Sequence, residues 1–125
     1  MPDLNGTEFR AFLPAKDFAV SKAFYEALGF RKIADHEVAI FDTGRGSGII
    51  VQQYYQANWA ENCMLSLQVD DLDAWWAHIA SLDLPGRFGV AAPRPPAMQP
   101  WGLRVAYVFD PSGVLWHFVE PPSQA

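Results

Sequence analysis

Few side chains in this sequence could carry out acid–base, nucleophilic or metal chemistry. The chain contains three histidines and one cysteine. The lone Cys63 cannot form an intrachain disulfide or a thiolate zinc site, so we expect a reducing compartment and no structural metal. The glycine-rich stretch 44–48, GRGSG, lacks the helix that must follow a nucleophilic serine or a phosphate-binding loop. It is typical of a hairpin turn instead.

The histidines and the cysteine each have a structural interpretation. His117 lies in the apolar run VLWHFVE (114–120), which is typical of a histidine in a cleft wall rather than of a catalytic base. His36, in a turn, and His78, on a polar helix face, are expected to be exposed to solvent. Cys63 enters an apolar strand and is expected to pack as a small hydrophobic side chain. No catalytic residue is therefore predicted.

Two of the tryptophans are candidates for ligand binding. Trp59 lies in the loop sequence YYQANWAEN (54–62) and Trp101 lies in the loop sequence PAMQPWG (96–102). Loops that border a cleft often carry binding residues, and an indole stacks on flat heteroaromatic or cationic groups. The alternative is that both indoles only cover the core from outside.

Length and composition limit the function classes. The chain has 125 residues, a mass of 14.0 kDa and 50% hydrophobic residues, as expected for one domain spanning 1–125. No apolar run reaches the roughly 18 to 20 residues of a membrane span, and residues 1–10 do not resemble a signal peptide, so a cytoplasmic location is expected. The net charge of −5 and pI near 4.9 disfavour nucleic acid and anionic membranes and favour a cationic partner.

Hydrophobic periodicity and turn residues predict an alternation of strands and helices. Helices are expected to begin at the N-caps Asp17 and Asp71, and the first should end at Gly29. The predicted strands are 8–13, 30–34, 38–42, 48–55, 63–69, 86–90, 103–110 and 114–120, with loops at 55–61 and 91–100.

The second half of the chain repeats the pattern of the first. A shift of 54 residues lays Asp17 on Asp71 and Leu28 on Leu82. We interpret this as an α+β fold of two βαβββ modules, about 8–55 and about 62–121, whose eight strands form one curved sheet around a cleft. Because strand side chains alternate between faces, every second residue should line the cleft, which is a ready ligand site.

Three segments carry a resemblance to a known family. They are DFAVSKAFYEALGF (17–30), QPWG (99–102) followed by VAYVFDPSG (105–113), and the final hairpin DPSGVLWHFVE (110–120). Together they resemble the vicinal oxygen chelate (glyoxalase/bleomycin resistance/dioxygenase) superfamily, and in particular its bleomycin-binding resistance proteins. This resemblance implies a cytoplasmic homodimer with two crevices at its interface, in which a cationic, planar-ringed glycopeptide antibiotic is sequestered without chemistry.

The resemblance also identifies where a metal would be held. Enzymes of this superfamily hold a divalent metal with four side chains, and counting from the two caps and the two hairpin turns puts Arg10, Gln52, Met64 and His117 at those positions. Arginine has no free lone pair and methionine is too soft for hard or borderline ions. We therefore expect no metal and no cofactor, and a three-ligand site of Glu8, Gln52 and His117 is the alternative if the register slips.

The leading prediction is a non-enzymatic protein that binds and sequesters a small-molecule antibiotic. Its expected ligand-binding residues are Trp59, Trp101, Gly102, Ser66, Gln52, Arg10 and His117. One alternative is a metal-dependent glyoxalase, lyase or dioxygenase of the same fold. Another is a protein-interaction module that uses the proline-rich loop 93–100 and the adjacent Trp75 and Trp76.

Overall fold

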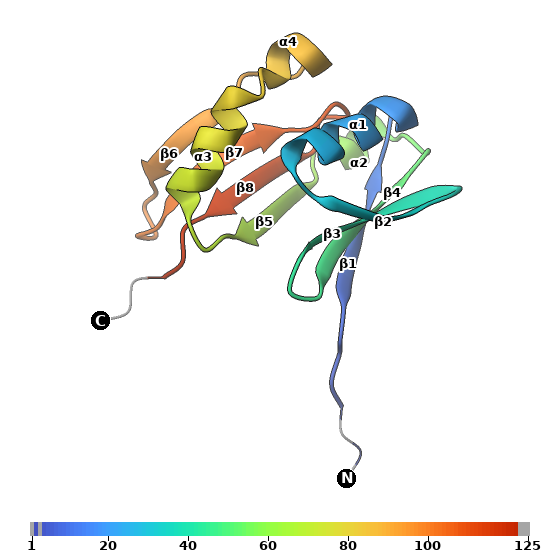
Figure 1. The fold of residues 1–125 in the computed structure, drawn as a ribbon, viewed down its shortest axis with the longest axis horizontal. Helices are drawn as coiled ribbons and strands as arrows, with labels where there is room; N and C mark the ends of the chain where they lie inside the picture. Colours follow the sequence, from blue (N-terminus) through green and yellow to red (C-terminus); the bar gives the residue numbers. More distant parts are fainter. Residues whose placement is uncertain (1, 3, 123–125) are drawn as a thin grey trace.

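The computed structural model describes residue 2 and residues 4–122, and it shows two sheets with helices packed against them (Figure 1). The first module contains β1 (Phe9–Pro14), α1 (Phe18–Leu28), β2 (Arg31–Asp35), β3 (Val38–Gly44) and β4 (Ser47–Gln52), and α2 (Ala57–Ala60) follows it. The second module contains β5 (Met64–Gln68), α3 (Leu72–Ser81), α4 (Leu84–Phe88), β6 (Arg94–Met98), β7 (Arg104–Phe109) and β8 (Leu115–Val119). Across the described residues, no helix is both long and apolar enough to span a membrane.

The two sheets repeat one topology. Their strand orders are β1-β4-β3-β2 and β5-β8-β7-β6, and in each sheet the first strand runs parallel to the last. The α+β class and the two βαβββ modules are therefore confirmed. The strands form two separate four-stranded ladders, so the two modules meet through side chains.

The predicted helix caps are present at matching positions of the two modules. The carboxylate of Asp17 accepts a hydrogen bond from Val20 N at 3.2 Å, and that of Asp71 accepts one from Ala74 N at 3.0 Å. Each bond satisfies a backbone donor that the first helical turn leaves free. Gly29 ends α1 in the left-handed conformation with φ of 110°, which a residue with a Cβ adopts only under strain. The glycine-rich stretch forms the β3–β4 hairpin turn as predicted, with positive φ at Arg45 and Gly46.

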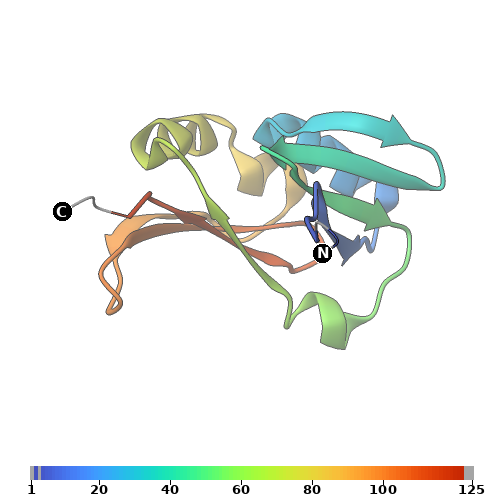
Figure 2. The same ribbon diagram turned by 90° about the horizontal axis from the view of Figure 1, so that it is seen from below.

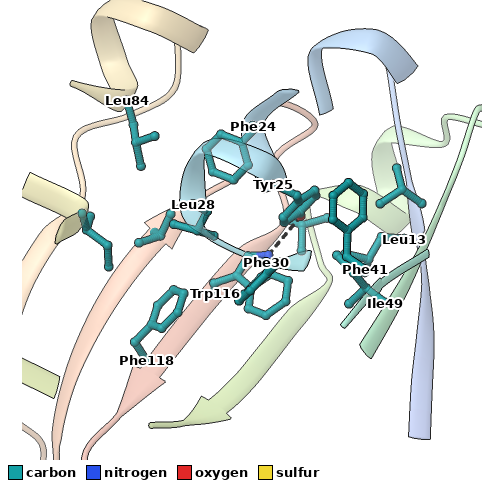
Figure 3. Close-up of a cluster of buried hydrophobic side chains, with 14 of the residues drawn as sticks. Leu13, Phe24, Tyr25, Leu28, Phe30, Phe41, Ile49, Leu84, Trp116 and Phe118 are labelled. Atoms are coloured by element: carbon teal, nitrogen blue, oxygen red, sulfur yellow. Dashed lines mark hydrogen bonds between the residues drawn. The ribbon is translucent and has the colours of Figure 1, made fainter. Parts of the chain in front are cut away.

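Helix α1 forms the common core of the two modules. Figure 3 shows its buried side chains Phe24, Tyr25 and Leu28 pointing toward residues from both sheets. The Tyr25 ring lies 5.8 Å from the ring of Phe41 on β3 and 5.8 Å from that of Trp116 on β8. The hydrophobic core is therefore shared, which fixes how one sheet lies against the other.

A buried polar network crosses this core. The Tyr25 hydroxyl donates to Asp110 Oδ2 at 2.6 Å and accepts from Trp116 Nε1 at 3.0 Å. Asp110 Oδ1 also accepts from the backbone N–H groups of Ser112 at 2.8 Å and Val114 at 2.9 Å. Burial raises the pKa of Asp110 and that of Tyr25 above their ordinary values. The network joins α1 of the first module to the β7–β8 hairpin of the second.

Two predictions around residues 86–100 are wrong. The predicted strand 86–90 is the helix α4, which Asp83 caps at its start and Gly89 ends in the left-handed conformation. The predicted loop 91–100 contains the edge strand β6, whose register with β7 shifts between Arg94 and Ala97, where two prolines lie. Proline cannot donate to a ladder but is tolerated at an edge, so its abundance misled the prediction.

One smaller expectation also needs revision. The predicted loop 55–61 contains the short helix α2, whose four residues begin without a side-chain cap. His78 is exposed as expected, yet its Nε2 lies 3.0 Å from the carbonyl oxygen of Leu28 at the end of α1. This contact adds a further link between α3 and α1.

Candidate ligand-binding face

Each sheet has one face covered by helices and one open face. In the second sheet Trp116 and Phe118 of β8 are buried, and their neighbours Leu115, His117 and Val119 alternate with them on the other face. Figure 2 shows α3 on one side of β6, β7 and β8. The opposite side, which we call the open face of the second sheet, is the candidate site.

A row of four polar side chains crosses this open face. The strand register pairs Ser66 with His117, His117 with Tyr107, and Tyr107 with Arg94, so one residue comes from each of β5, β8, β7 and β6. Paired residues share a face, and the rings of Tyr107 and His117 confirm this with a T-shaped contact at 4.7 Å. We call these four residues the polar row.

His117 is half-buried within the polar row. Its Nε2 is shielded from solvent and makes no hydrogen bond to any described residue. Burial lowers the pKa of the His117 imidazole, which therefore stays neutral at neutral pH and offers one N–H donor and one acceptor. A buried polar atom without a partner costs free energy, and a ligand could bind this nitrogen only once the imidazole turns toward the open face.

Apolar side chains lie beside the polar row. Met64, Leu115 and Phe109 form the next row toward one end of the sheet, and Met64 is 66% exposed. A cavity of about 240 Å³ lies between β5 and the strands β1 and β4, and Met64 and Ser66 line it together with core-side residues such as Ile49 and Trp116. The face thus combines apolar surface with a few polar groups, as small-molecule sites do.

The first sheet has its own open face. Arg10 on β1 lies opposite Gly48, and Gln52 on β4 lies opposite Pro14, so both belong to the face away from the core. Arg10 is ion-paired with Glu8 at 2.8 Å. Phe12 between them is 55% exposed, which leaves this face apolar at its centre.

The structure divides the seven predicted ligand-binding residues among four places. Ser66 and His117 are neighbours in the polar row. Arg10 and Gln52 lie on the open face of the first sheet, so the described chain does not bring them to His117.

The predicted loop residues occupy the remaining two places. Trp101 and Gly102 lie in the β6–β7 turn, where Trp101 is 60% exposed and Gly102 has φ of 94° and donates its N–H to Gln99 O. Trp59 is half-buried in α2 with its ring 6.3 Å from that of Tyr54.

Two members of the polar row, Tyr107 and Arg94, were not predicted from the sequence as binding residues. Tyr107 lies in the predicted strand 103–110, and its spacing from the hairpin could have paired it with His117. Arg94 lies in the stretch predicted as a loop, so no face could be assigned to its side chain.

Comparison with known proteins agrees with this fold. Residues 9–118 match the model of the Glyoxalase/Bleomycin resistance protein/Dioxygenase superfamily. The chain belongs to this superfamily. It is 28% identical over 116 residues to a bleomycin resistance protein of Klebsiella pneumoniae, covering 86% of this chain and 87% of that protein.

Solved structures of the superfamily show the same architecture. A bleomycin-binding protein complexed with bleomycin is 26% identical, with a TM-score of 0.76 over 92% of this chain and 98% of that chain. TnmS3, an antibiotic-binding protein from Streptomyces sp. CB03234, has a TM-score of 0.76 over 97% of this chain and 100% of its own. At 22% identity TnmS3 supports the fold alone.

The side chains of this member do not fit the divalent metal of the superfamily's enzymes. The strand pairing shows which residues of the two sheets occupy matching positions. When Arg10 of β1 is matched with Met64 of β5, His117 matches Ile50 and Gln52 matches Val119, so Gln52 and His117 do not occupy matching positions. His117 therefore has a serine and a tyrosine as neighbours rather than carboxylates or histidines. Across residues 4–122, three or more histidine, cysteine, aspartate or glutamate side chains do not gather at any point.

The single chain does not assemble the alternative three-ligand metal site. The carboxylate of Glu8 is engaged by Arg10 at 2.8 Å. Gln52 lies on the first sheet and His117 on the second. We therefore derive no chemistry through a metal.

Proposed function

We propose that this protein binds and sequesters a small planar-ringed antibiotic of the bleomycin kind without catalysing a reaction on it. The observation that carries the proposal is the open face of the second sheet, where an apolar surface surrounds the unpartnered Nε2 of His117. Two of the four positions expected to hold a metal carry Arg10 and Met64, which are poor ligands for a hard or borderline ion. The names of the relatives, a bleomycin resistance protein and a bleomycin-binding protein, support the ligand class.

The proposal includes a homodimer in which a second copy covers the open faces. Phe12 on the open face of the first sheet is 55% exposed and Met64 on that of the second is 66% exposed, so each open face presents a large apolar side chain to solvent. If the first sheet of one copy faces the second sheet of the other, Arg10 and Gln52 join the polar row in one crevice. The dimer would then bring together residues that the single chain keeps apart.

We expect sedimentation equilibrium to give twice the 14.0 kDa mass of the chain. Substituting Phe12 with glutamate should shift the protein toward monomer, because a charge replaces apolar contact at the interface. Thr7→Glu, which adds the same charge at an exposed position before β1, is the control. A wild-type protein that remains a monomer at high concentration would contradict the shared crevice.

Trp101 is the proposed stacking residue. Its indole is 60% exposed in the β6–β7 turn and lies close in the chain to Met98, which is 65% exposed. A flat ring of the ligand would bury both. Trp59, by contrast, is half-buried and its ring lies near that of Tyr54, so we expect it to contribute less than Trp101 to the affinity for the ligand.

The test is a titration with bleomycin of protein first assayed for bound metal, with and without added copper or zinc. We expect saturable quenching of tryptophan fluorescence on metal-free protein. By calorimetry, Trp101→Ala should raise the Kd about tenfold, which is ~1.4 kcal/mol, whereas Trp101→Phe should retain most of the affinity because it keeps a flat ring.

Two outcomes would contradict the proposal. Purified protein that holds one divalent ion per chain and does not respond to bleomycin would favour the metal-dependent glyoxalase, lyase or dioxygenase alternative. Equal affinity of wild type and Trp101→Ala for bleomycin would remove Trp101 from the site. The two features that suggested an interaction module have structural roles instead. The proline-rich stretch contains β6, and Trp75 and Trp76 pack against the core.

A further inference from the structure

The charge on the open face of the second sheet differs in sign from that of the whole chain. The chain carries a formal net charge of −5, yet the polar row contains an arginine and no carboxylate. The nearby carboxylates point elsewhere, since Glu120 and Asp73 both bind Arg104 and Asp110 is buried against Tyr25. The acidic balance that favoured a cationic ligand therefore lies off this face.

Arg94 supplies the positive charge and is unpaired. Its guanidinium is the one arginine side chain within residues 4–122 that makes neither a hydrogen bond nor an ion pair. Every other arginine in that range binds a carboxylate or, in the case of Arg87, the backbone carbonyl of Leu82. A guanidinium left free on an edge strand is available for a carboxylate from outside the chain.

The polar row places further hydrogen-bonding groups beside this charge. Tyr107 lies between Arg94 and His117, and Ser66 lies beyond His117. Neighbouring strands are about 4.8 Å apart, so the row spans roughly 15 Å from β6 to β5. A planar ligand of two or three fused rings fits across such a row with an acidic group at one end.

We infer that the polar row is an acid-recognition subsite: it takes a planar aromatic ligand whose carboxylate binds Arg94 and Tyr107 and whose body covers His117 and Ser66. This inference goes beyond the proposed function, because it assigns to one subsite of the open face an anionic group rather than the cationic group that the net charge of the chain favoured. It predicts that an anionic group is favoured on this face and that a cationic group in the same position is rejected, because no carboxylate is there to balance it.

The test uses two naphthalene probes that differ in charge, 2-naphthoate and 2-naphthylmethylammonium, each titrated into the full chain at about pH 7. Binding is followed by the NMR shifts of the His117 ring and of the backbone amides of Ser66 and Tyr107. We expect 2-naphthoate to bind at least about tenfold more tightly than the ammonium probe, and we expect the preference to weaken as salt is added.

Arg94→Gln should reduce that preference to about twofold or less, since it removes the charge and keeps a polar side chain. Arg94 is exposed on an edge strand, so the variant should fold normally. The matched control is Arg87→Gln on α4, which removes an exposed charge away from the open face and should keep the preference.

Equal or tighter binding of the ammonium probe would overturn the inference, as would an unchanged preference in Arg94→Gln or shifts confined to residues outside the polar row. The bleomycin titration separates this inference from the proposed function. Bleomycin binding without any naphthoate preference would refute the subsite alone, whereas a naphthoate preference without bleomycin binding would refute the proposed antibiotic alone.

Discussion

Tyr25→Phe is expected to lower the free energy of unfolding by about 2–4 kcal/mol, although it removes only one oxygen atom. That oxygen donates to Asp110 Oδ2 and accepts from Trp116 Nε1. Both partners are buried, so the variant leaves a carboxylate oxygen and an indole N–H without a hydrogen bond. Urea unfolding followed by circular dichroism measures the loss.

Tyr54→Phe is the control for this substitution. The Tyr54 hydroxyl accepts a hydrogen bond from Gln56 at 3.1 Å, but the side chain is 52% exposed, so water replaces the lost contact. We expect a change within about 0.5 kcal/mol. Equal losses in the two variants would show that the buried network does not stabilise the fold.

Asp110→Asn is expected to lower the free energy of unfolding by about 3 kcal/mol. The carboxylate of Asp110 faces three donors, namely the Tyr25 hydroxyl and the backbone N–H groups of Ser112 and Val114. An amide replaces one acceptor oxygen with a donor, so at least one of these bonds is lost. A repulsive contact between two donors takes its place.

The cost of Asp110→Asn should also depend on pH. Burial raises the pKa of Asp110 in the folded state above its unfolded value of about 3.9. A carboxyl whose pKa is raised by folding contributes stability below the unfolded pKa and loses it as the pH rises through the folded pKa. The advantage of wild type over the variant should therefore shrink from about pH 3 upward.

Urea unfolding of both proteins between about pH 3 and pH 7 measures this advantage. The pKa values of the carboxylates Asp35, Asp42 and Asp73 are lowered in the folded protein. Their contribution to stability is therefore lost as the pH falls, not as it rises. They are present in both proteins and cancel in the difference. A difference that grows as the pH rises would contradict the assignment of the raised pKa to Asp110.

The network also matters for the binding face. It joins α1 to the hairpin that carries β8, and β8 carries His117. We expect variants that weaken the network to disturb the position of the second sheet relative to the first. Bleomycin affinity should then fall in Tyr25→Phe, where no residue of the open face has changed.

Local sequence signals predicted the parts of the fold that short-range interactions decide. A carboxylate at an N-cap bonds to a backbone N–H three residues away, so Asp17 and Asp71 could be read directly. The glycine after α1 and the glycine-rich hairpin turn are local in the same sense. The repeat of these signals after 54 residues was sufficient to predict two βαβββ modules.

The same reasoning failed where local signals conflict with tertiary contacts. Pro95 and Pro96 argue against a strand, yet β6 pairs with β7 because a sheet edge needs fewer backbone donors and the register shifts around the prolines. The predicted strand 86–90 is a helix because the cap at Asp83 and the left-handed Gly89 enclose a single helical turn. Neither outcome follows from hydrophobic periodicity.

The sequence by itself determined the modules, the helix caps, the family resemblance and the presence of His117 and Trp101 as candidate binding residues. Only the tertiary structure decided which residues are neighbours on the binding face. The polar row takes one residue from each of four strands, and strand pairing joins residues as far apart as Ser66 and His117. Packing across the whole sheet sets this strand pairing, so it cannot be deduced from the spacing of neighbouring residues in the sequence.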